Sequence, residues 1–363
     1  MPNSSVREYL LSFANAYQSA FALAAASELD IFTELIKRNG ATLSELSKAL
    51  ELDERRLNYL LAALVTMEIL AKSENLYVVE EQFVPYLDSR NSATVLPMLR
   101  HQANCARGWV QLATSIKTGA PAPVIPGVND EKVEFQDFIL AMDVASKRFV
   151  SSITQQLFEQ DLLHFEKLLD LGGASGSYSF AFLERNPNPK SKAIIFDRQE
   201  ALKEAKIKAQ NTELDNRLEF YSGDFYKDPY PQDVDFVWIS AIIHQQNEET
   251  TAQMFRQSFN SLRPGGLVAV RDVFINEDQT GPRAAAFFGI NMAIRTEQGR
   301  VYTVGETVNL LTEAGFQNAR LAIPAEDMGA VVVAEKARRF DFQIRASVIT
   351  RSLSFVPIIS TKE

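Results

Sequence analysis

The sequence is short of several residue types, and each shortage narrows what the protein can do. Cysteine occurs once among 363 residues, so no disulfide can form within the chain, and nothing indicates an oxidising compartment. We interpret Cys105 as a buried, unreactive thiol. Basic residues are a minority, with 37 Lys and Arg against 46 Asp and Glu, and the net charge is −9. Such a field repels polyanions, so nucleic acid is a poor candidate partner.

Long apolar runs are missing too. The longest uncharged stretch, Tyr9–Ser27, contains Asn15 and Gln18 and directly follows Glu8. We therefore expect neither a membrane span nor a cleaved leader, and we place the protein in the cytoplasm without a membrane partner. Apolar residues make up 46% of the chain and charged ones 23%, which is ordinary for a globular protein.

The N-terminal part predicts helices that pack against a second subunit. Apolar spacing from Ser5 to about Leu35 predicts helix without a polar face. Thr42 and Glu45 form a capping box, and Asp53 can cap a second helix. Residues 69–79 predict two short strands, which complete a winged-helix outline. This module either binds DNA or serves subunit contacts, and we favour subunit contacts because the charges at the start of its second helix nearly cancel.

The rest of the chain predicts an α/β domain. We expect a dimerisation domain over 1–118, a Pro- and Gly-rich linker over 119–131, a catalytic domain over 132–337, and a tail over 338–363 without an assigned role. The catalytic domain opens with a helix, Lys132–Gln160, and then alternates strands with helices, which predicts a parallel, doubly wound sheet. We expect strands at 167–171, 193–196, 218–221, 234–239, 267–270, 320–323 and 330–334, and helices near 283–295 and 306–314.

The stretch EKLLDLGGASGSYS, residues 166–179, predicts a buried strand, a tight turn and the start of a helix. Gly172, Gly173 and Gly176 have no Cβ, so the backbone can approach a ligand closely. The phosphate-binding patterns G-x-G-x-x-G and Gly-Lys-Ser/Thr are absent. Asp170 at the end of the strand favours a cation over a phosphate, and S-adenosylmethionine, with its ammonium and sulfonium groups, matches that sign.

Further candidates for cofactor binding follow the next strands. Asp197 ends the second strand of the domain, where an acid accepts hydrogen bonds from ribose hydroxyls. Gly223, Asp224 and Phe225 follow the third strand and could offer a carboxylate and a ring to an adenine. Ser240, at the end of the fourth strand, completes the predicted set. Their order within one sheet predicts an adenosine-containing ligand.

With these motifs in place, the chain resembles the class I small-molecule O-methyltransferases, the group that includes acetylserotonin and plant phenolic O-methyltransferases. The resemblance covers about residues 10–336 and lies in DLGGASG, IIFDRQ, RLEFYSGDFY, DVDFVWISAIIHQQNEE, LRPGGLVAVRDV and NMAIRTEQGRVYT, the last leading to EAGF. It implies a Rossmann-like seven-stranded sheet behind a winged-helix dimerisation domain, and a homodimer. It also implies S-adenosylmethionine as cofactor, S-adenosylhomocysteine as product and no metal ion.

The resemblance also implies a general base, His244, just past the carboxyl end of the fourth strand. A phenolic hydroxyl has a pKa near ~10 and is a poor nucleophile until deprotonated, which a neutral imidazole can assist. Asp272, after the fifth strand, matches an acid that orients this histidine in the family. The other two histidines, His101 and His164, need only surface or capping roles.

Four residues depart from the family pattern. Gln245 and Gln246 stand where members usually have Asp-Trp after the histidine, and Val301 stands where plant members have a second acid. Ala174 replaces the middle glycine of the cofactor turn and adds a Cβ there. Cofactor binding is still expected despite these departures. The acid–base scheme stays open, because the acceptor could instead be a hydroxyl that is already acidic.

The prediction as a whole is methyl transfer from S-adenosylmethionine to a hydroxyl of a small, aromatic or polyketide-like molecule. The pocket for this acceptor is expected at Met142, Phe288, Asn291 and Met292, although Met and Phe at helical spacing also suit a plain core. One alternative is an enzyme of the same fold that keeps the cofactor but catalyses a hydroxylation or a rearrangement. The other is a winged-helix regulator that binds DNA, against which the acidic balance counts.

Overall fold

The computed structural model describes residues 6–123 and 131–338, and for residues 131–136 it describes the backbone only. The chain divides into two compact units, Met1–Arg148 and Phe149–Glu363. The division falls inside the helix α9 (Glu131–Glu159), whose bounds agree with the predicted helix. Most of the predicted linker and all but one residue of the predicted tail lie outside the described residues, so the domain boundaries inferred from the sequence stay predictions.

The first unit is mostly helical, as predicted. The segment expected to be helical from Ser5 to about Leu35 is helical, but it is divided into three helices. The α-helical hydrogen-bond pattern is interrupted at Ala16, whose backbone stays right-handed, and the chain turns at Leu29–Asp30. Asp30 has a left-handed backbone, with φ of 55°, which no helix can continue through. The helices of this unit before α9 are α1 (Val6–Asn15), α2 (Tyr17–Glu28), α3 (Ile31–Arg38), α4 (Leu43–Ala49), α5 (Glu54–Thr66), α6 (Val84–Leu87), α7 (Leu96–Trp109) and α8 (Leu112–Thr118).

The winged-helix outline is confirmed in its local structure. The Thr42 side chain accepts the N–H of Glu45 and the Glu45 side chain returns to the Thr42 N–H, while Asp53 caps α5 by accepting the N–H of Arg56. The predicted strands are β2 (Leu70–Ser73) and β3 (Leu76–Val79). A third strand, β1 (Ala41–Thr42), pairs with β3 and was not predicted, because two residues show no periodicity.

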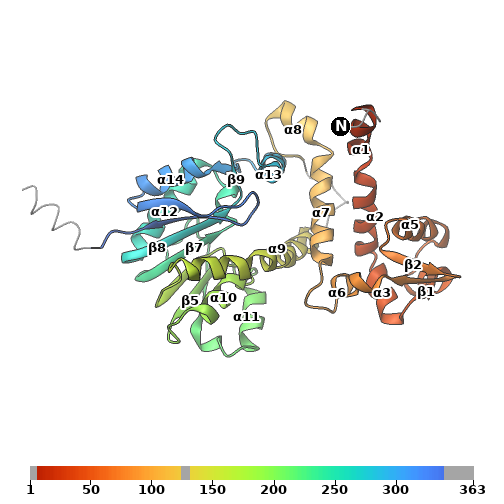
Figure 1. Cartoon of the computed structure of the whole chain (residues 1–363), viewed down its shortest axis with the longest axis horizontal. Coiled ribbons are helices and arrows are strands. Elements are labelled where there is room, and N and C mark those ends of the chain that lie inside the picture. The colour runs from red at the N-terminus through yellow and green to blue at the C-terminus, as the bar shows by residue number, and fades with distance from the viewer. Residues whose placement is uncertain (1–5, 124–130, 339–363) are drawn as a thin grey trace, which may run out of the picture. The chain divides into compact units, whose positions relative to one another are not determined.

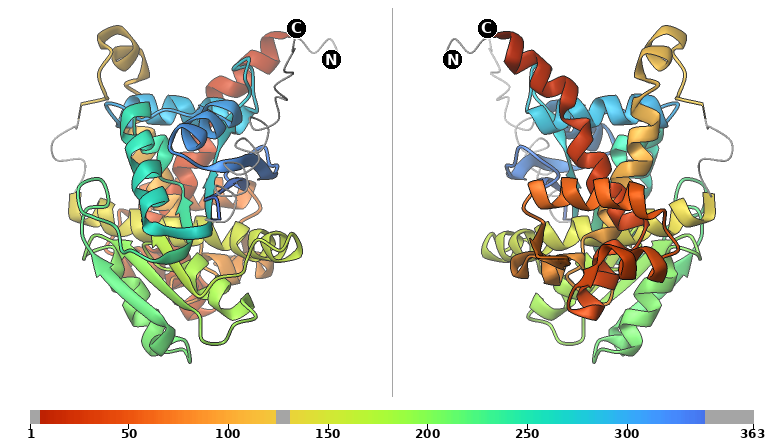
Figure 2. Two further views of the ribbon diagram at one scale, coloured as in Figure 1. Left: turned by 90° about the vertical axis from the view of Figure 1, so that its left-hand side faces the viewer. Right: turned by 90° about the vertical axis from the view of Figure 1, so that its right-hand side faces the viewer.

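Helix α1 exposes an apolar surface. It buries no residue within the described chain, and Figures 1 and 2 show it running end to end with α2, in red. Its exposed apolar side chains include Tyr9, Leu10 and Phe13, and the surface continues on α2 with Tyr17 and Phe21. A contiguous apolar surface of this kind marks a protein interface. The helix without a polar face that the sequence predicts is therefore present in the folded unit as an exposed apolar surface.

The second unit is built on a seven-stranded sheet, counted over its described residues 149–338. The strand order is β11-β12-β8-β7-β4-β5-β6, and β12 runs antiparallel to both of its neighbours. The central strands are buried on both faces, which is why they read as nearly continuous apolar runs. Their bounds are β4 (Lys167–Leu171), β5 (Lys192–Asp197), β6 (Leu218–Ser222), β7 (Val234–Ser240), β8 (Leu262–Asp272), β11 (Gln317–Ile323) and β12 (Ala330–Glu335).

Helices cover both faces of the sheet (Figure 1). On one face, α12 and α14 pack over a core that includes Phe255 and Leu311. On the other face, the C-terminal end of α9 packs with α10 and α11 over Phe236 and Trp238 of β7, and Phe182 of α10 lies edge to face against both rings. The helices of this unit are α10 (Ser177–Arg185), α11 (Leu202–Gln210), α12 (Glu248–Ser261), α13 (Arg283–Arg295) and α14 (Val304–Glu313).

Three details of this unit differ from the sequence prediction. Strand β8 is longer than expected because it includes the Arg263–Gly266 segment that reads as a turn. A short parallel pair, β9 (Phe274–Ile275) and β10 (Tyr302–Thr303), was not predicted. This pair leads into α14, where Thr303 and Glu306 form a capping box that starts the helix two residues earlier than predicted.

The five neighbouring parallel strands bring their carboxyl ends to one edge of the sheet, where open α/β sheets bind ligands.

Candidate functional site

The glycine turn follows β4 at this edge and has room for no added side chains. Gly172 and Gly176 have left-handed backbones, with φ of +67° and +74°. A Cβ on Gly172 would lie 2.5 Å from Cδ1 of Ile242, and one on Gly173 would lie 2.7 Å from Cγ of Asp170. Both contacts are closer than packed atoms allow, so glycine is required at these positions. The Gly172 N–H donates to the carbonyl oxygen of Phe196, which fixes the turn against β5.

Asp197 at the end of β5 holds this turn from the other side. Its Oδ2 accepts the N–H of Ala174 at 3.0 Å, and its Oδ1 accepts the N–H of Arg198 at 2.7 Å. Burial raises the pKa of Asp197, although these two hydrogen bonds and the charge of Arg198 oppose the shift. Each carboxylate oxygen has one protein donor and so keeps a lone pair for a ligand hydroxyl. Ala174 itself adopts a left-handed backbone, with φ of 43°.

Asp170 lies beneath the turn and is almost completely buried. Burial raises its pKa to about 7; the charge of Asp197 adds to the shift, and a hydrogen bond from Ser179 opposes it. In that bond the Ser179 hydroxyl donates to Oδ2 of Asp170 at 2.6 Å. A carboxyl group in this state gains its charge most readily when a cation lies close to it.

Gly223, Asp224 and Phe225 follow β6 and lie beside Asp197 and the glycine turn. The Gly223 N–H donates to the carbonyl oxygen of Asp197 at 3.1 Å. The Phe225 ring lies against Gly172, since a Cβ built there would be 3.4 Å from Cε1 of the ring. Burial raises the pKa of Asp224, but hydrogen bonds from Lys227 and the backbone outweigh it and the pKa is lowered. The residues expected from three separate motifs therefore lie together at one edge.

His244, in the turn after β7, and Asp272, the last residue of β8, form a buried pair. Nδ1 of His244 lies 2.8 Å from Oδ1 of Asp272, and both side chains are less than a tenth exposed. The Asp272 carboxylate also accepts the N–H of Val273 at 2.8 Å and that of His244 at 3.4 Å. The backbone oxygen of His244 accepts the N–H of Arg300 at 2.9 Å. The imidazole is therefore held at both its ring and its main chain, as a positioned acid–base group must be.

Two sequence profiles match the chain. The profile of the O-methyltransferase dimerisation domain matches residues 11–83, and that of the O-methyltransferase domain matches residues 129–317. The chain belongs to the O-methyltransferase family. The second match spans more than half of the chain and contains the glycine turn, His244 and Asp272, and the first contains the winged-helix module. The enzyme class and the dimerisation domain expected from the sequence are thus confirmed.

Individual relatives agree with this family. The tetracenomycin polyketide synthesis 8-O-methyl transferase TcmO of Streptomyces glaucescens is 27% identical over 318 residues, which cover 86% of this chain and 91% of that protein. The 3-hydroxy-5-methyl-1-naphthoate 3-O-methyltransferase of Streptomyces sahachiroi is 24% identical and covers 82% and 86%. The crystal structure of human N-acetylserotonin methyltransferase in complex with SAM has a TM-score of 0.78 at 22% identity and covers 93% and 100%. That structure shows the shared fold.

The expected substrate residues of this O-methyltransferase are placed only in part. Phe288 on α13 lies edge to face against the His244 ring, with centroids 4.7 Å apart. Asn291 and Met292 follow on the same helix, where Met292 is buried and Asn291 partly exposed. Met142 lies on α9 within the first unit, so its part in the same site stays a prediction.

The residues that depart from the family pattern in this O-methyltransferase have the following contacts. The Gln245 side chain donates to the carbonyl oxygen of Ala241 at 3.3 Å, and the carbonyl oxygen of Gln246 accepts the Tyr302 hydroxyl at 2.9 Å. Both bonds brace the turn that carries His244. Val301 lies near Gly289 of α13, at 3.5 Å from a Cβ built there. Asp272 is thus the acid that the described structure pairs with His244.

One buried residue beside the candidate site of this O-methyltransferase was missed in the sequence. Arg271, directly before Asp272, is buried, and its Nη1 donates to Oγ of Ser240 at 2.9 Å. The signal was a charged residue inside the apolar run LVAVRDV, which is otherwise typical of a buried strand. Ser240, expected to bind the cofactor, thus has a charged partner beside the His244 turn.

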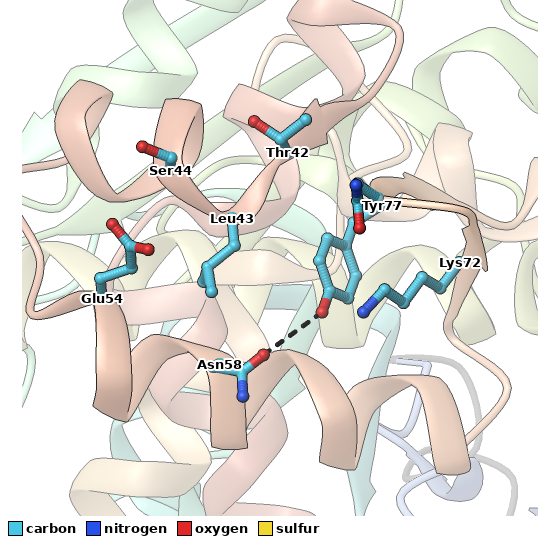
Figure 3. Close-up of a pocket in the computed structure, with 8 residues that line it drawn as sticks. Thr42, Leu43, Ser44, Glu54, Asn58, Lys72 and Tyr77 are labelled. Carbon is cyan, nitrogen blue, oxygen red and sulfur yellow. Dashed lines mark hydrogen bonds between the residues drawn. The ribbon is translucent and has the colours of Figure 1, made fainter.

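A pocket of about 310 Å³ is found in the winged-helix module of the O-methyltransferase (Figure 3). The Tyr77 hydroxyl donates to Oδ1 of Asn58 at 3.5 Å, and Lys72 lies over the Tyr77 ring. No residue predicted to belong to the active site lines this pocket. Its remaining side chains are Thr42, Leu43, Ser44, Glu54 and Asn75.

Across residues 6–123 and 131–338, the O-methyltransferase has no helix with the length and apolar character needed to cross a membrane. The same residues hold no group of three or more side chains arranged to bind a metal ion. The cytoplasmic location and the absence of a metal cofactor, both inferred from the sequence, stay predictions.

Proposed function

We propose that this O-methyltransferase moves a methyl group from S-adenosylmethionine to a hydroxyl of a small aromatic or polyketide-like molecule, with His244 as general base. The observation that carries the proposal is the buried His244–Asp272 pair, with 2.8 Å between Nδ1 and Oδ1, beside a glycine turn at the carboxyl edge of the sheet. The relatives named for a polyketide and a naphthoate support the acceptor class.

The residues of the turn fit S-adenosylmethionine. Gly172 and Gly173 pack directly on Ile242 and Asp170 without a side chain of their own, so the backbone of the turn stays low against the strand ends at this edge. Asp197 keeps one lone pair on each oxygen for the ribose hydroxyls, and Asp170 lies below as a carboxyl group whose charged form a cation favours. When bound, the cofactor supplies a methyl group already activated by the sulfonium. The protein then has to align the acceptor, exclude water and remove a proton.

Removal of that proton falls to His244. An ionised carboxylate can only accept hydrogen bonds, so Asp272 assigns the proton of the neutral imidazole to Nδ1 and leaves the lone pair on Nε2. This nitrogen can take the proton of the acceptor hydroxyl, and Asp272 then stabilises the imidazolium that forms. The Phe288 ring, edge to face with the imidazole, supplies an apolar wall on that side. Asn291 and Met292, on the same helix as Phe288, complete the proposed acceptor pocket within this unit.

We also propose that the enzyme is a homodimer formed through its N-terminal unit. The dimerisation-domain profile begins at residue 11, within α1. About half of the surface is exposed at each of four apolar side chains, Tyr9, Leu10, Phe13 and Tyr17. An exposed apolar surface of this kind supports an interface at α1 and α2.

The function is tested with S-adenosylmethionine labelled on its methyl group and a panel of hydroxylated naphthoates and aromatic polyketides. We expect label in the acceptor, and a loss of about 10²–10⁴-fold in kcat for H244A, the range of general base catalysis. The control is H164A, because His164 is half exposed and pairs with Asp161 outside the site. Full activity of H244A would refute the role of His244 as general base. An acceptor that gains an oxygen atom without taking up label would favour hydroxylation, and one converted without label into an isomer of unchanged mass would favour a rearrangement.

A further inference from the structure

Arg271 is a buried cation at the carboxyl edge of the sheet, and its contacts join four elements. Its Nη1 donates to Oγ of Ser240 on β7 at 2.9 Å, and its backbone oxygen accepts the N–H of Ala241 at 2.8 Å. Its guanidinium carbon lies 4.9 Å from the ring centre of Phe149 on α9 and 5.3 Å from that of Tyr178 on α10. These contacts hold the ends of β7 and β8 against the helix that follows the glycine turn.

The guanidinium of Arg271 has no direct ion pair. The charges of Asp272 and Asp327 act on it, but among the described residues it has no ion-pair contact, and its Nε has no hydrogen-bond partner. The Tyr178 hydroxyl and Nε1 of Trp238, on rings that lie 4.8 Å apart, have none either. Buried polar groups are almost always hydrogen-bonded, and a buried cation is stabilised by a negative group close to it. This part of the site therefore favours the arrival of an anionic group.

The chemistry of the Arg271–Ser240 bond determines what Ser240 can do. A guanidinium is a donor only, so the Ser240 oxygen is the acceptor and its own hydrogen is free to be donated. A charged donor on that oxygen also polarises the O–H bond and strengthens it as a donor. Ser240 ends β7 and is partly exposed, so this hydrogen is available at the edge where the cofactor is proposed to bind.

The strand order indicates which part of the cofactor Ser240 would meet. Asp197 ends β5 and Ser240 ends β7, with β4 and the glycine turn between them. Two strand spacings separate them, about 10 Å. A cofactor whose ribose lies at Asp197 and whose sulfonium lies over β4 extends its aminoacyl group toward β7. The carboxylate of that group is the only anion that the cofactor carries.

We propose that Arg271 is a positioning residue that acts through Ser240: its guanidinium sets the Ser240 hydroxyl as a donor to the carboxylate at the aminoacyl end of the cofactor. The inference rests on the proposed use of S-adenosylmethionine. Ser240 makes the contact, and Arg271 provides the orientation and the positive charge behind it.

The test compares two ligands by calorimetry: S-adenosylhomocysteine, and 5′-methylthioadenosine, which keeps the adenosine and the sulfur but lacks the aminoacyl group. R271M and S240A should each weaken binding of S-adenosylhomocysteine about 10–150-fold, the range of a hydrogen bond to a charged group, and change binding of methylthioadenosine less than about twofold. The double variant should be no weaker than the weaker single variant. R263M, at the other end of the same strand and on the surface, is the control.

Each other outcome overturns a defined part of the inference. Equal losses for both ligands would make Arg271 a purely structural residue, and losses that add in the double variant would make the two side chains independent. If R271M does not fold, R271Q replaces it, since the amide still donates but carries no charge. A wild type that binds neither ligand overturns the proposed cofactor and this inference together, whereas binding of both with equal losses overturns the inference alone.

Discussion

The buried carboxyl group of Asp170 makes the stability of the enzyme depend on pH in an unusual direction. Burial raises its pKa from an ordinary 3.8 to about 7. Below about pH 4 the group is protonated in both the folded and the unfolded chain. As pH rises toward 7 only the unfolded chain ionises, so the folded state loses stability throughout this interval. Above pH 7 both states are ionised and the loss stays constant.

The size of this effect follows from the shift. One pKa unit corresponds to about 1.4 kcal/mol, so the whole interval amounts to about 4 kcal/mol. Between pH 5 and pH 8 the expected loss is about 3 kcal/mol. D170N removes the titration and keeps an oxygen that can accept the hydrogen bond from Ser179. We therefore expect D170N to gain about 3 kcal/mol over the wild type when the pH is raised from 5 to 8, whatever its stability at pH 5.

Urea denaturation of both proteins without cofactor, at pH 5, 6, 7 and 8, measures this difference. D224N is the matched control. Hydrogen bonds to Asp224 lower its pKa despite burial, so its titration falls in the acid range below the interval tested. Its difference from the wild type should therefore stay constant from pH 5 to pH 8. The reasoning is refuted if the difference in unfolding free energy between D170N and the wild type also stays constant from pH 5 to pH 8.

Three further predictions concern the site and the proposed dimer. D272N should lower kcat about 10–150-fold, the range of a hydrogen bond to a charged group, and leave the affinity for S-adenosylhomocysteine unchanged; a parallel loss of affinity would contradict this. G173A should destabilise the fold by about 1–3 kcal/mol and weaken cofactor binding, because its Cβ would lie 2.7 Å from Asp170 Cγ; an unchanged melting temperature would show that the turn can yield. L10E/F13E should sediment as a monomer, and a persistent dimer would place the interface elsewhere.

The sheet was predictable because its strands are buried on both faces. Runs such as VDFVWIS in β7 and AVVVAE in β12 have the length and composition of buried strands, and the strands found in the structure include all seven predicted ones. The breaks in the first helical segment were not predictable, since the interruption at Ala16 leaves the apolar spacing intact. Two-residue strands such as β9 carry no period at all. The early start of α14 could have been read from the capping box at Thr303 and Glu306.

The site was predictable where its residues end strands. Asp197 and His244 follow apolar runs, and parallel strands bring their carboxyl ends to one edge. Arg271 was missed because the partner of a buried charge depends on the strand register, and the register that pairs it with Ser240 cannot be read from one strand. Burial of Asp170 was equally hidden, because it depends on how closely Gly173 and Ser179 pack over its carboxyl group.

The hydrogen bonds of Asp197 have a consequence for engineering this enzyme. One carboxylate holds Ala174 in a left-handed conformation and, in the proposed complex, also holds the ribose. A change of nucleoside specificity at this position would therefore also release the turn, so a loss of affinity in D197A cannot be assigned to the ribose contact alone. Redesign of the cofactor preference would have to begin with A174G, which lets the turn keep its shape without Asp197, and alter the acid afterwards.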